Sequence, residues 1–192
     1  MSGPAVGLLL FEPRAFEDIL ADVVPWLESV CRPVEVRAGG TLDFWVEDGS
    51  AVGFPVPDPT GVGVFFLTED EETPGEDEDY SALSRPPVQG LVLGAGCSGP
   101  ANHRLLGHLT LALAQRLEAL VDFGGLLGSP VPRDDTDEGA SPDRARAPAA
   151  ALPGRVVEVP YETGDGGREV GHVGDAEFLA AWLRHPDFHM VK

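Results

Sequence analysis

Residues 88–127 carry almost no charge, although the 192-residue chain has a net charge of −19. Two arginines and two acidic residues are the only Arg, Lys, Asp or Glu side chains in this stretch, which is rich in leucine. Residues 88–93 have the composition of a buried strand, and leucines recur at helical spacing from 105 to 120. The centre of the fold is therefore predicted to be a strand followed by an amphipathic helix.

The rest of the chain alternates short apolar runs with turn signals. The pattern predicts helices at about 13–30, 101–120 and 176–184, and strands at 5–11, 34–36, 42–46, 62–67, 88–93, 121–127, 155–161 and 169–173. Closely spaced strands with Gly and Pro between them favour antiparallel pairing, and the length suits one domain. We predict a single α+β domain over 1–192, mainly an antiparallel sheet with about three helices.

Two long loops interrupt this pattern. Residues 68–87 contain eight acidic residues against Arg85 alone, a net charge of −7, so we expect a solvated, mobile loop. Residues 128–154 are rich in Pro, Asp, Ala and Arg and have no apolar period. We expect this second mobile loop to add surface without adding core.

The net charge also limits the partners. Phosphate binding needs a positive field, which argues against nucleic acid and anionic membranes. The apolar run at 5–11 is too short for a signal peptide or a membrane span. Cys31 and Cys97 match no metal-binding spacing, so we expect free thiols in a cytoplasmic protein.

Gly94, Gly96 and Gly99 form a G-x-G-x-x-G pattern between the central strand and helix, and Asp122 lies 23 residues further on. This spacing is typical of a dinucleotide site, in which the helix N-terminus holds the pyrophosphate. Pro100 follows directly and no second parallel strand–helix–strand unit is visible. We favour a glycine-rich turn without a cofactor and keep a nucleotide-binding enzyme as the alternative.

Cys97 lies inside the same turn. A thiol near a helix N-terminus can have a lowered pKa, and His103 or His108 would be the base of a thiol-dependent enzyme. No third member of such a catalytic group is recognisable. A packed small residue is the interpretation we favour.

His185, Asp187 and His189 alternate near the C-terminus. In an extended chain their side chains would lie on one side and suit a divalent metal. His185 next to Pro186 is also typical of a helix end, with a turn beginning at Asp187. We favour this structural role and no metal.

The acidic loop supplies the candidate partner-binding residues, which are Glu69, Asp70, Glu71, Glu72, Glu76, Asp77, Glu78 and Asp79. Acidic surfaces accelerate association with basic proteins. No serine-hydrolase, phosphate-loop or zinc-protease motif is present. We therefore expect a non-catalytic protein with a basic protein partner, and the competing interpretation is that the acidity only maintains solubility.

Two stretches carry a family resemblance. Residues 102–104 through 121–125, and 171–175 through 185–192, resemble a family of small, acidic, uncharacterised proteins from high-GC bacteria. That family is similar in size, acidity and strand–helix order to immunity-type proteins, which neutralise secreted bacterial toxins. The resemblance implies a small cytoplasmic binding protein and nothing finer, and it assigns no role to any residue. The acidity, together with the absence of catalytic motifs, leads us to expect a toxin domain as the basic partner.

Overall fold

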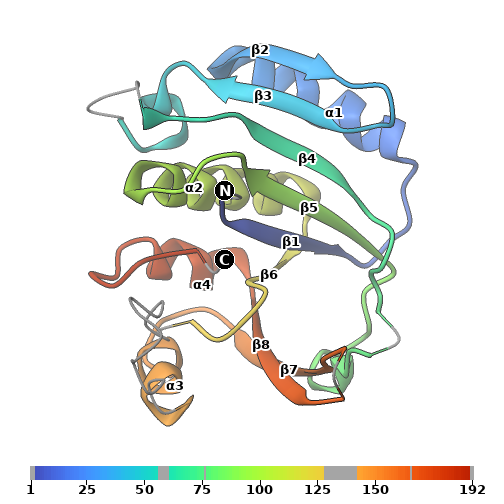
Figure 1. The fold of residues 1–192 in the computed structure, drawn as a ribbon, viewed down its shortest axis with the longest axis vertical. Helices are drawn as coiled ribbons and strands as arrows, with labels where there is room; N and C mark the ends of the chain where they lie inside the picture. Colours follow the sequence, from blue (N-terminus) through green and yellow to red (C-terminus); the bar gives the residue numbers. More distant parts are fainter. Residues whose placement is uncertain (1–2, 56–60, 76, 128–141, 165, 191–192) are drawn as a thin grey trace.

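An eight-stranded antiparallel sheet runs through the protein, as seen in a computed structural model that describes residues 3–55, 61–75, 77–127, 142–164 and 166–190 (Figure 1). Its elements are β1 (Ala5–Leu10), α1 (Phe16–Val30), β2 (Cys31–Val36), β3 (Leu42–Val46), β4 (Phe65–Asp70), β5 (Gln89–Ala95), α2 (Pro100–Leu117), β6 (Leu120–Asp122), α3 (Pro142–Ala150), β7 (Val156–Glu162), β8 (Arg168–Gly174) and α4 (Ala176–Trp182). The strand order is β2-β3-β4-β5-β1-β6-β8-β7. The predicted α+β class is confirmed.

Helices α1, α2 and α4 are the three predicted helices, and they lie on one side of the sheet (Figure 1). Within the described chain, none is long and apolar enough to cross a membrane. Helix α1 continues through Pro25, which is exposed. A proline inside a helix removes one backbone hydrogen bond. The buried stripe of α1, which packs on the sheet, compensates for that loss; it consists of Phe16, Ile19, Val23, Leu27 and Val30.

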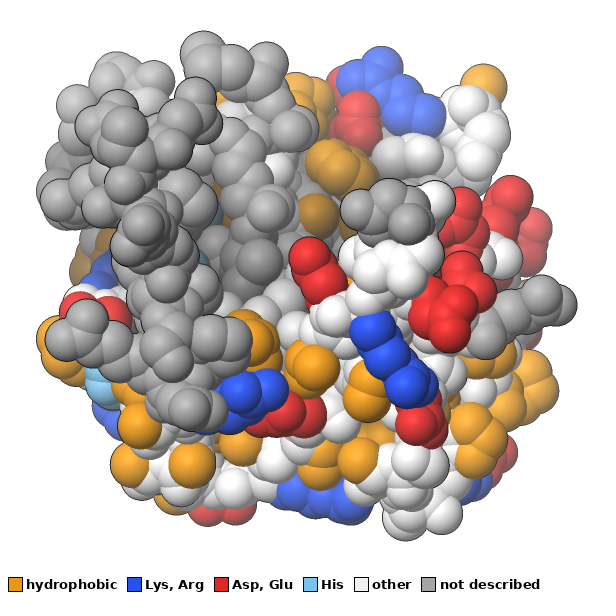
Figure 2. Space-filling model, turned by 60° about the horizontal axis from the view of Figure 1, so that its bottom comes forward, with side chains coloured by type: hydrophobic (Ala, Val, Ile, Leu, Met, Phe, Trp, Pro, Cys, Tyr) orange, Lys and Arg blue, Asp and Glu red, His pale blue; other side chains and the backbone are white. Residues whose placement is uncertain are grey.

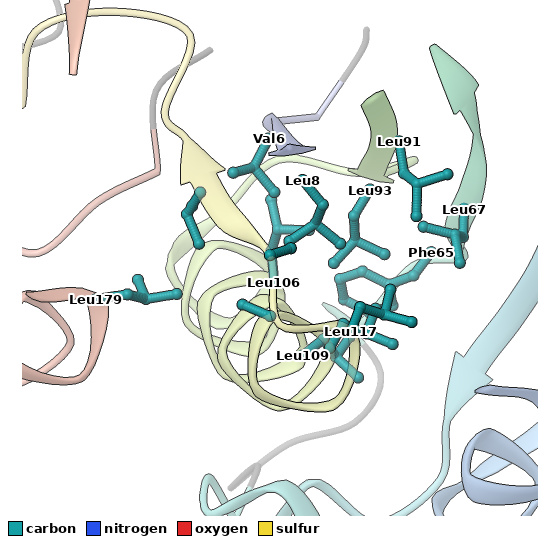
Figure 3. Packing of buried hydrophobic residues seen from close by; sticks show 14 of the residues in the cluster. Val6, Leu8, Phe65, Leu67, Leu91, Leu93, Leu106, Leu109, Leu117 and Leu179 are labelled. Atoms are coloured by element: carbon teal, nitrogen blue, oxygen red, sulfur yellow. The ribbon is translucent and has the colours of Figure 1, made fainter. Parts of the chain in front are cut away.

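The core lies between this helical layer and the sheet. Figure 3 shows Leu106, Leu109 and Leu117 of α2 facing the sheet residues Leu8 and Leu93. All the leucines at 105, 106, 109 and 113 are fully buried, which confirms the helical stripe predicted from the sequence. Alternate residues of each strand point to this side because side chains alternate along a strand.

The opposite side of the sheet, which we call the open face, has a different composition. Glycines occupy it at Gly7 in β1, Gly94 in β5 and Gly171 in β8. Gly7 pairs with Asp122 of β6, and the other two pair with residues of β1 and β7. A Cβ atom at Gly94 would overlap the ring of Phe66, so this glycine lets an aromatic side chain lie flat on the sheet. A second, smaller apolar cluster also lies on this face; it contains Leu9, Tyr80, Leu83, Val159 and Val173.

The structure corrects two predicted strand limits. Strand β4 covers Phe65–Asp70 rather than 62–67, and β6 ends at Asp122 rather than at 127. The β6 strand stops because the N–H of Gly124 donates a hydrogen bond to the Asp122 carboxylate, and Gly124 adopts φ +68°, in the left-handed region.

The prediction of a loop over 128–154 is wrong for residues 142–150, where α3 forms. Arg146 of α3 donates two hydrogen bonds to Glu158 of β7, with N···O distances of 2.6 and 3.1 Å, and Ala149 is buried. Composition could not reveal this helix, because its Pro, Asp, Arg and Ala residues give no apolar period. The remaining part of that predicted loop, 128–141, lies outside the described residues.

Candidate partner-binding site

The acidic segment, defined here as residues 69–79, connects two distant parts of the sheet. It begins at the end of β4 and reaches the edge strand β7 (Figure 1). There the N–H of Asp79 donates to the carbonyl of Pro160 at 2.8 Å, and the N–H of Glu162 donates to the carbonyl of Asp77 at 3.1 Å. Glu78 forms an isolated antiparallel bridge with Tyr161. The segment is therefore fastened to β7 by backbone hydrogen bonds.

This attachment corrects the expectation of a solvated loop at 68–87. Tyr80, Leu83 and Pro87 are buried, and the first two pack against the open face. An average over the whole stretch conceals these anchors, because eight acidic residues dominate its composition. Acidic side chains of the loop are exposed to solvent, and its apolar side chains anchor it to the open face of the sheet.

Three of the predicted partner-binding residues organise the loop itself. The carboxylate of Asp70 accepts hydrogen bonds from the N–H of Glu72 (3.0 Å) and the hydroxyl of Thr73 (2.6 Å). Glu78 accepts from the N–H of Gly75 (3.1 Å) and the hydroxyl of Tyr80 (2.6 Å).

The third of them, Asp79, accepts a hydrogen bond from the N–H of Ser81 at 3.0 Å. Hydrogen bonds from Ser81 lower the pKa of Asp79, so this carboxylate is charged in the folded protein. Its role is to cap the 3-10 turn η3 (Tyr80–Ala82).

The remaining acids of the segment face solvent. Glu71, Glu72 and Asp77 are exposed, and Glu69 accepts a hydrogen bond from Gln89 at 3.1 Å. Glu76 lies outside the described residues. Figure 2 shows Asp and Glu side chains gathered on the side of the molecule where the β4–β5 connection runs. The exposed acids are thus free to meet a partner, whereas the bonded ones hold the segment in place.

Asp122 lies on the same face, at the end of β6. Its carboxylate accepts a hydrogen bond from the N–H of Gly124 at 2.8 Å. The pKa of Asp122 is raised to about 6, mainly by burial; the Gly124 N–H opposes this rise, and the negative charges of Glu78 and Asp70 add to it. Among the residues that the structure describes, no cation contributes to this balance.

The two tyrosines of the chain, Tyr80 and Tyr161, both border this region. Burial and the nearby carboxylates, including Asp122, raise the pKa of both phenols, that of Tyr161 to about 12. The hydroxyl of Tyr161 donates to Glu169 at 2.9 Å, which fixes the orientation of its ring. Both phenols therefore stay protonated and act as hydrogen-bond donors.

A cavity of 210 Å³ opens between these groups, and we call it the Asp122 pocket. Its lining consists of Glu78, Asp122, Gly124, Val159, Tyr161 and Gly171. Two carboxylates, one aromatic ring and one valine therefore surround the space, with no Lys, Arg or His among them. The chemistry of this lining favours a positively charged group with an apolar part.

The surrounding surface does not neutralise the acidic segment. Arg37, Arg14 and Arg146 pair with acids of their own neighbourhoods, and Arg85 lies 3.7 Å from Glu12. None of the ion pairs between described residues includes an acid of the acidic segment. Arg168 is near enough to Asp79 to favour its charged form.

The glycine-rich turn at 94–99 lies at the opposite end of β5 from this site. Strand β5 is antiparallel to both β1 and β4, so the pattern is not part of a parallel strand–helix–strand unit. Cβ atoms would overlap Phe66 at Gly94 and would lie 2.6 Å from Val64 at Gly96. Gly99 has φ +128°, where side chains are strained. Close packing and backbone conformation therefore account for all three glycines.

Cys97 is exposed and lies against Gly63, where a Cβ would come within 2.6 Å of the sulfur. The two histidines considered as its base have other partners: His103 accepts a hydrogen bond from the N–H of Met190, and His108 stacks on Phe54. The other cysteine, Cys31, is buried, and burial raises the pKa of its thiol to about 12. Both are free thiols, and the Cys31 thiol is protonated and unreactive.

The rings of His185 and His189 pack against Trp182, whereas Asp187 is exposed. The His185 ring stacks on the indole with centroids 4.9 Å apart, and the His189 ring meets it edge-on at 5.9 Å. His185 accepts a hydrogen bond from the N–H of Asp187 at 3.2 Å, and its carbonyl accepts one from the N–H of Phe188 at 3.1 Å, so the turn begins at His185 rather than at Asp187. In the described part of the chain no three His, Cys, Asp or Glu residues gather as a metal ion would require.

The two stretches that carry the family resemblance pack on each other. His103 accepts a hydrogen bond from the N–H of Met190 at 3.2 Å, and Arg104 donates to the carbonyl of Leu183 at 3.2 Å. Gly107 leaves room for the ring of Phe188. These residues fasten the C-terminal segment to α2, so their role is structural.

Sequence reasoning missed Tyr161, Glu169 and Gly171 and assigned Asp122 to the glycine pattern. Asp122 and Tyr161 come together only through the β6–β8–β7 pairing, which involves residues far apart in the chain. One signal was available: the chain has only two tyrosines, and one of them follows directly on the acidic run.

Comparisons with known proteins give one match. Neither the curated proteins nor the solved structures contain a match to the chain. One family model matches residues 2–192, and its description is a family of unknown function, DUF6368. Because the match covers nearly the whole chain, this protein belongs to the DUF6368 family.

Proposed function

We propose that this protein is a non-catalytic binding protein of the cytoplasm whose acidic segment and Asp122 pocket form the contact surface for a basic protein. The partner is a toxin domain that the protein neutralises. The observation that carries the proposal is the fixed position of exposed acids: Glu71, Glu72 and Asp77 are exposed on a segment fastened at both ends.

A fixed acidic surface suits recognition better than a mobile one. Binding costs less conformational entropy when the loop is already ordered, and charges held together create a stronger field than charges on a free chain. Acids organised by their own hydrogen bonds, as Asp70 and Glu78 are, keep this arrangement in the free protein. The surface is therefore prepared for a cationic partner.

The toxin partner follows from charge and chemistry together. A toxin domain that acts on nucleic acid needs a basic cleft, and an acidic surface blocks such a cleft by presenting the charge of its substrate. Two free cysteines suit a reducing compartment, where a toxin entering the cell would be met.

The test compares two triple variants that each remove three negative charges. Glu71→Gln, Glu72→Gln and Asp77→Asn neutralise the exposed acids of the segment, and Glu17→Gln, Asp18→Asn and Glu28→Gln neutralise exposed acids of α1. The binding partner is the basic product of the neighbouring gene, and association is measured by surface plasmon resonance at several salt concentrations.

We expect the segment variant to associate about tenfold more slowly at low salt and with a flatter salt dependence, because steering depends on the local charge. The α1 variant should associate as the wild type does. Equal effects of the two variants would show that only total charge matters. A neighbouring gene product that is acidic, or that does not bind, would contradict the proposal.

A further inference from the structure

The Asp122 pocket has the size of one side chain rather than of a small-molecule substrate. Its volume is 210 Å³, whereas small-molecule sites typically measure roughly 300–1,000 Å³. The pocket lies directly beside the acidic segment, with Glu78 belonging to both. A partner seated on the segment would therefore bring its side chains to the mouth of the pocket.

The Asp122 carboxylate has spare hydrogen-bonding capacity in this pocket. One oxygen accepts the N–H of Gly124, and the other has no hydrogen-bond partner among the residues that the structure describes. Burial makes this charge unfavourable, since it raises the pKa of Asp122 to about 6. A bound cation would donate hydrogen bonds to the second oxygen and supply a positive charge beside the carboxylate.

Glu78 and Tyr161 form the other walls. One oxygen of Glu78 accepts from Gly75 and Tyr80, so this carboxylate is held beside the pocket and adds a second negative charge. Tyr161 is fixed by its bond to Glu169, and its ring and Val159 give the pocket an apolar surface. Carboxylates combined with an aromatic ring are the surroundings in which a planar guanidinium both donates hydrogen bonds and stacks.

A glycine at position 171 helps to keep the pocket open. At Gly171 an added Cβ would lie 3.9 Å from both the Asp122 carboxylate and the Tyr161 ring, in ordinary contact without overlap. The absence of a side chain at Gly171 therefore contributes to the open space beside the carboxylate.

We propose that the Asp122 pocket receives the guanidinium group of one arginine side chain of the basic partner, with Asp122 and Glu78 accepting its hydrogen bonds and Tyr161 stacking on its plane. This inference rests on the proposed function and names the chemical group that the contact surface recognises.

The test uses N-acetylarginine methylamide as the probe and the citrulline analogue as its neutral isostere. Binding is followed by chemical shifts of the Gly171 and Gly124 amides and by tyrosine difference absorbance, which reports on this region because both tyrosines lie here. We expect saturable shifts with the arginine probe and none with the citrulline analogue.

Two variants and one control locate the binding. Asp122→Asn keeps an oxygen for the Gly124 N–H and removes the charge, and Gly171→Ala fills the space without changing the charge. Each should weaken probe binding by about tenfold or more. Gly164→Ala, where no atom lies within 4 Å of the added Cβ, should bind like the wild type.

Three results would overturn the inference: equal binding of the citrulline analogue, unchanged binding by Asp122→Asn, or unchanged binding by Gly171→Ala. The proposed function is tested separately with the neighbouring gene product. If that protein associates in the charge-dependent way described above and Gly171→Ala leaves its association unchanged, the pocket inference fails and the proposed function stands. If the probe binds in the pocket and the segment variant associates normally, the proposed function fails.

Discussion

The two faces of the sheet are built from different kinds of residue. On the helix-covered face, Leu8, Leu93 and Phe65 are fully buried beneath α2. On the open face, glycines, a partly buried aspartate and two tyrosines lie beneath a fastened acidic segment. The first face supplies most of the apolar burial that stabilises the fold.

The difference shows that the open face retains groups that do not favour folding. A partly buried carboxylate with no cation beside it among the described residues opposes folding, and glycines in strands pack fewer atoms than larger residues would. Such features are found where a protein binds something else. Substitutions in the core of the helix-covered face should therefore lower stability most, whereas substitutions at Asp122 and Gly171 on the open face should weaken binding.

The largest effect is expected in the helix-covered core. Leu113→Ala should lower the free energy of unfolding by about 2–5 kcal/mol, since Leu113 is fully buried and the change leaves a cavity. Leu111→Ala, at a partly buried position of the same helix, should cost clearly less. Urea denaturation measures both. Equal losses would show that α2 is not packed by one stripe.

Gly94→Ala tests whether the glycine pattern serves packing. The added Cβ overlaps the Phe66 ring, so we expect a loss of about 1–3 kcal/mol that shrinks in a Phe66→Ala background. Denaturation of the single and double variants gives the coupling.

The competing interpretation of 94–99 predicts something else. A nucleotide site would bind NAD or ATP in calorimetric titration, and Gly94→Ala would lose that binding while remaining stable. Observing this pair of results would replace the packing explanation.

Asp122→Asn should stabilise the protein by about 1–3 kcal/mol at neutral pH, because it removes a charge that burial disfavours. Folded Asp122 has a pKa of about 6 against an ordinary value of 3.8, so folding takes up a proton between these pH values. The wild type therefore loses stability from this group as the pH rises from about 4 to 6. The advantage of Asp122→Asn should be full above pH 6 and vanish at lower pH in thermal denaturation, and an advantage independent of pH would refute the assignment.

The smallest effect concerns the anchor of the acidic segment. Tyr80→Phe removes the hydroxyl that donates to Glu78 and should cost about 0.5–1.5 kcal/mol. Tyr161→Phe removes a more exposed hydrogen bond to Glu169 and should cost less. Hydrogen exchange of the Asp79 and Glu162 amides should quicken in Tyr80→Phe alone. Faster exchange in Tyr161→Phe only would place the anchor elsewhere.

The sequence predicts the helix-covered face well, because local periodicity encodes it. The stripe of α2 and the Asp175 cap of α4, whose carboxylate accepts the N–H of Phe178 at 2.7 Å, are both readable from neighbouring residues. The eight acidic residues are equally plain as a run. Each of these features depends on residues that are close together in the chain.

The open face could not be predicted in the same way. The Asp122 pocket depends on the pairing of β6 with β8 and on the bridge between Glu78 and Tyr161, and no local pattern indicates either. The anchoring of the segment depends on Tyr80 and Leu83 meeting Leu9 from the first strand. The average composition of 68–87 predicts solvent exposure, because its eight acidic residues outnumber the two apolar residues that anchor the segment.

The place of β1 in the middle of the sheet has a consequence for how the chain assembles. Ala5 pairs with Gly94 and Gly7 pairs with Asp122. Strand β1 can therefore pair only after β5 and β6, which come much later in the chain, have been synthesised. Such distant pairings slow folding, because a large loop must close before its contacts form. The acidic segment reaches its final position only when β7 has joined the sheet. A chain that stops before β7 therefore cannot hold the acidic segment in this position.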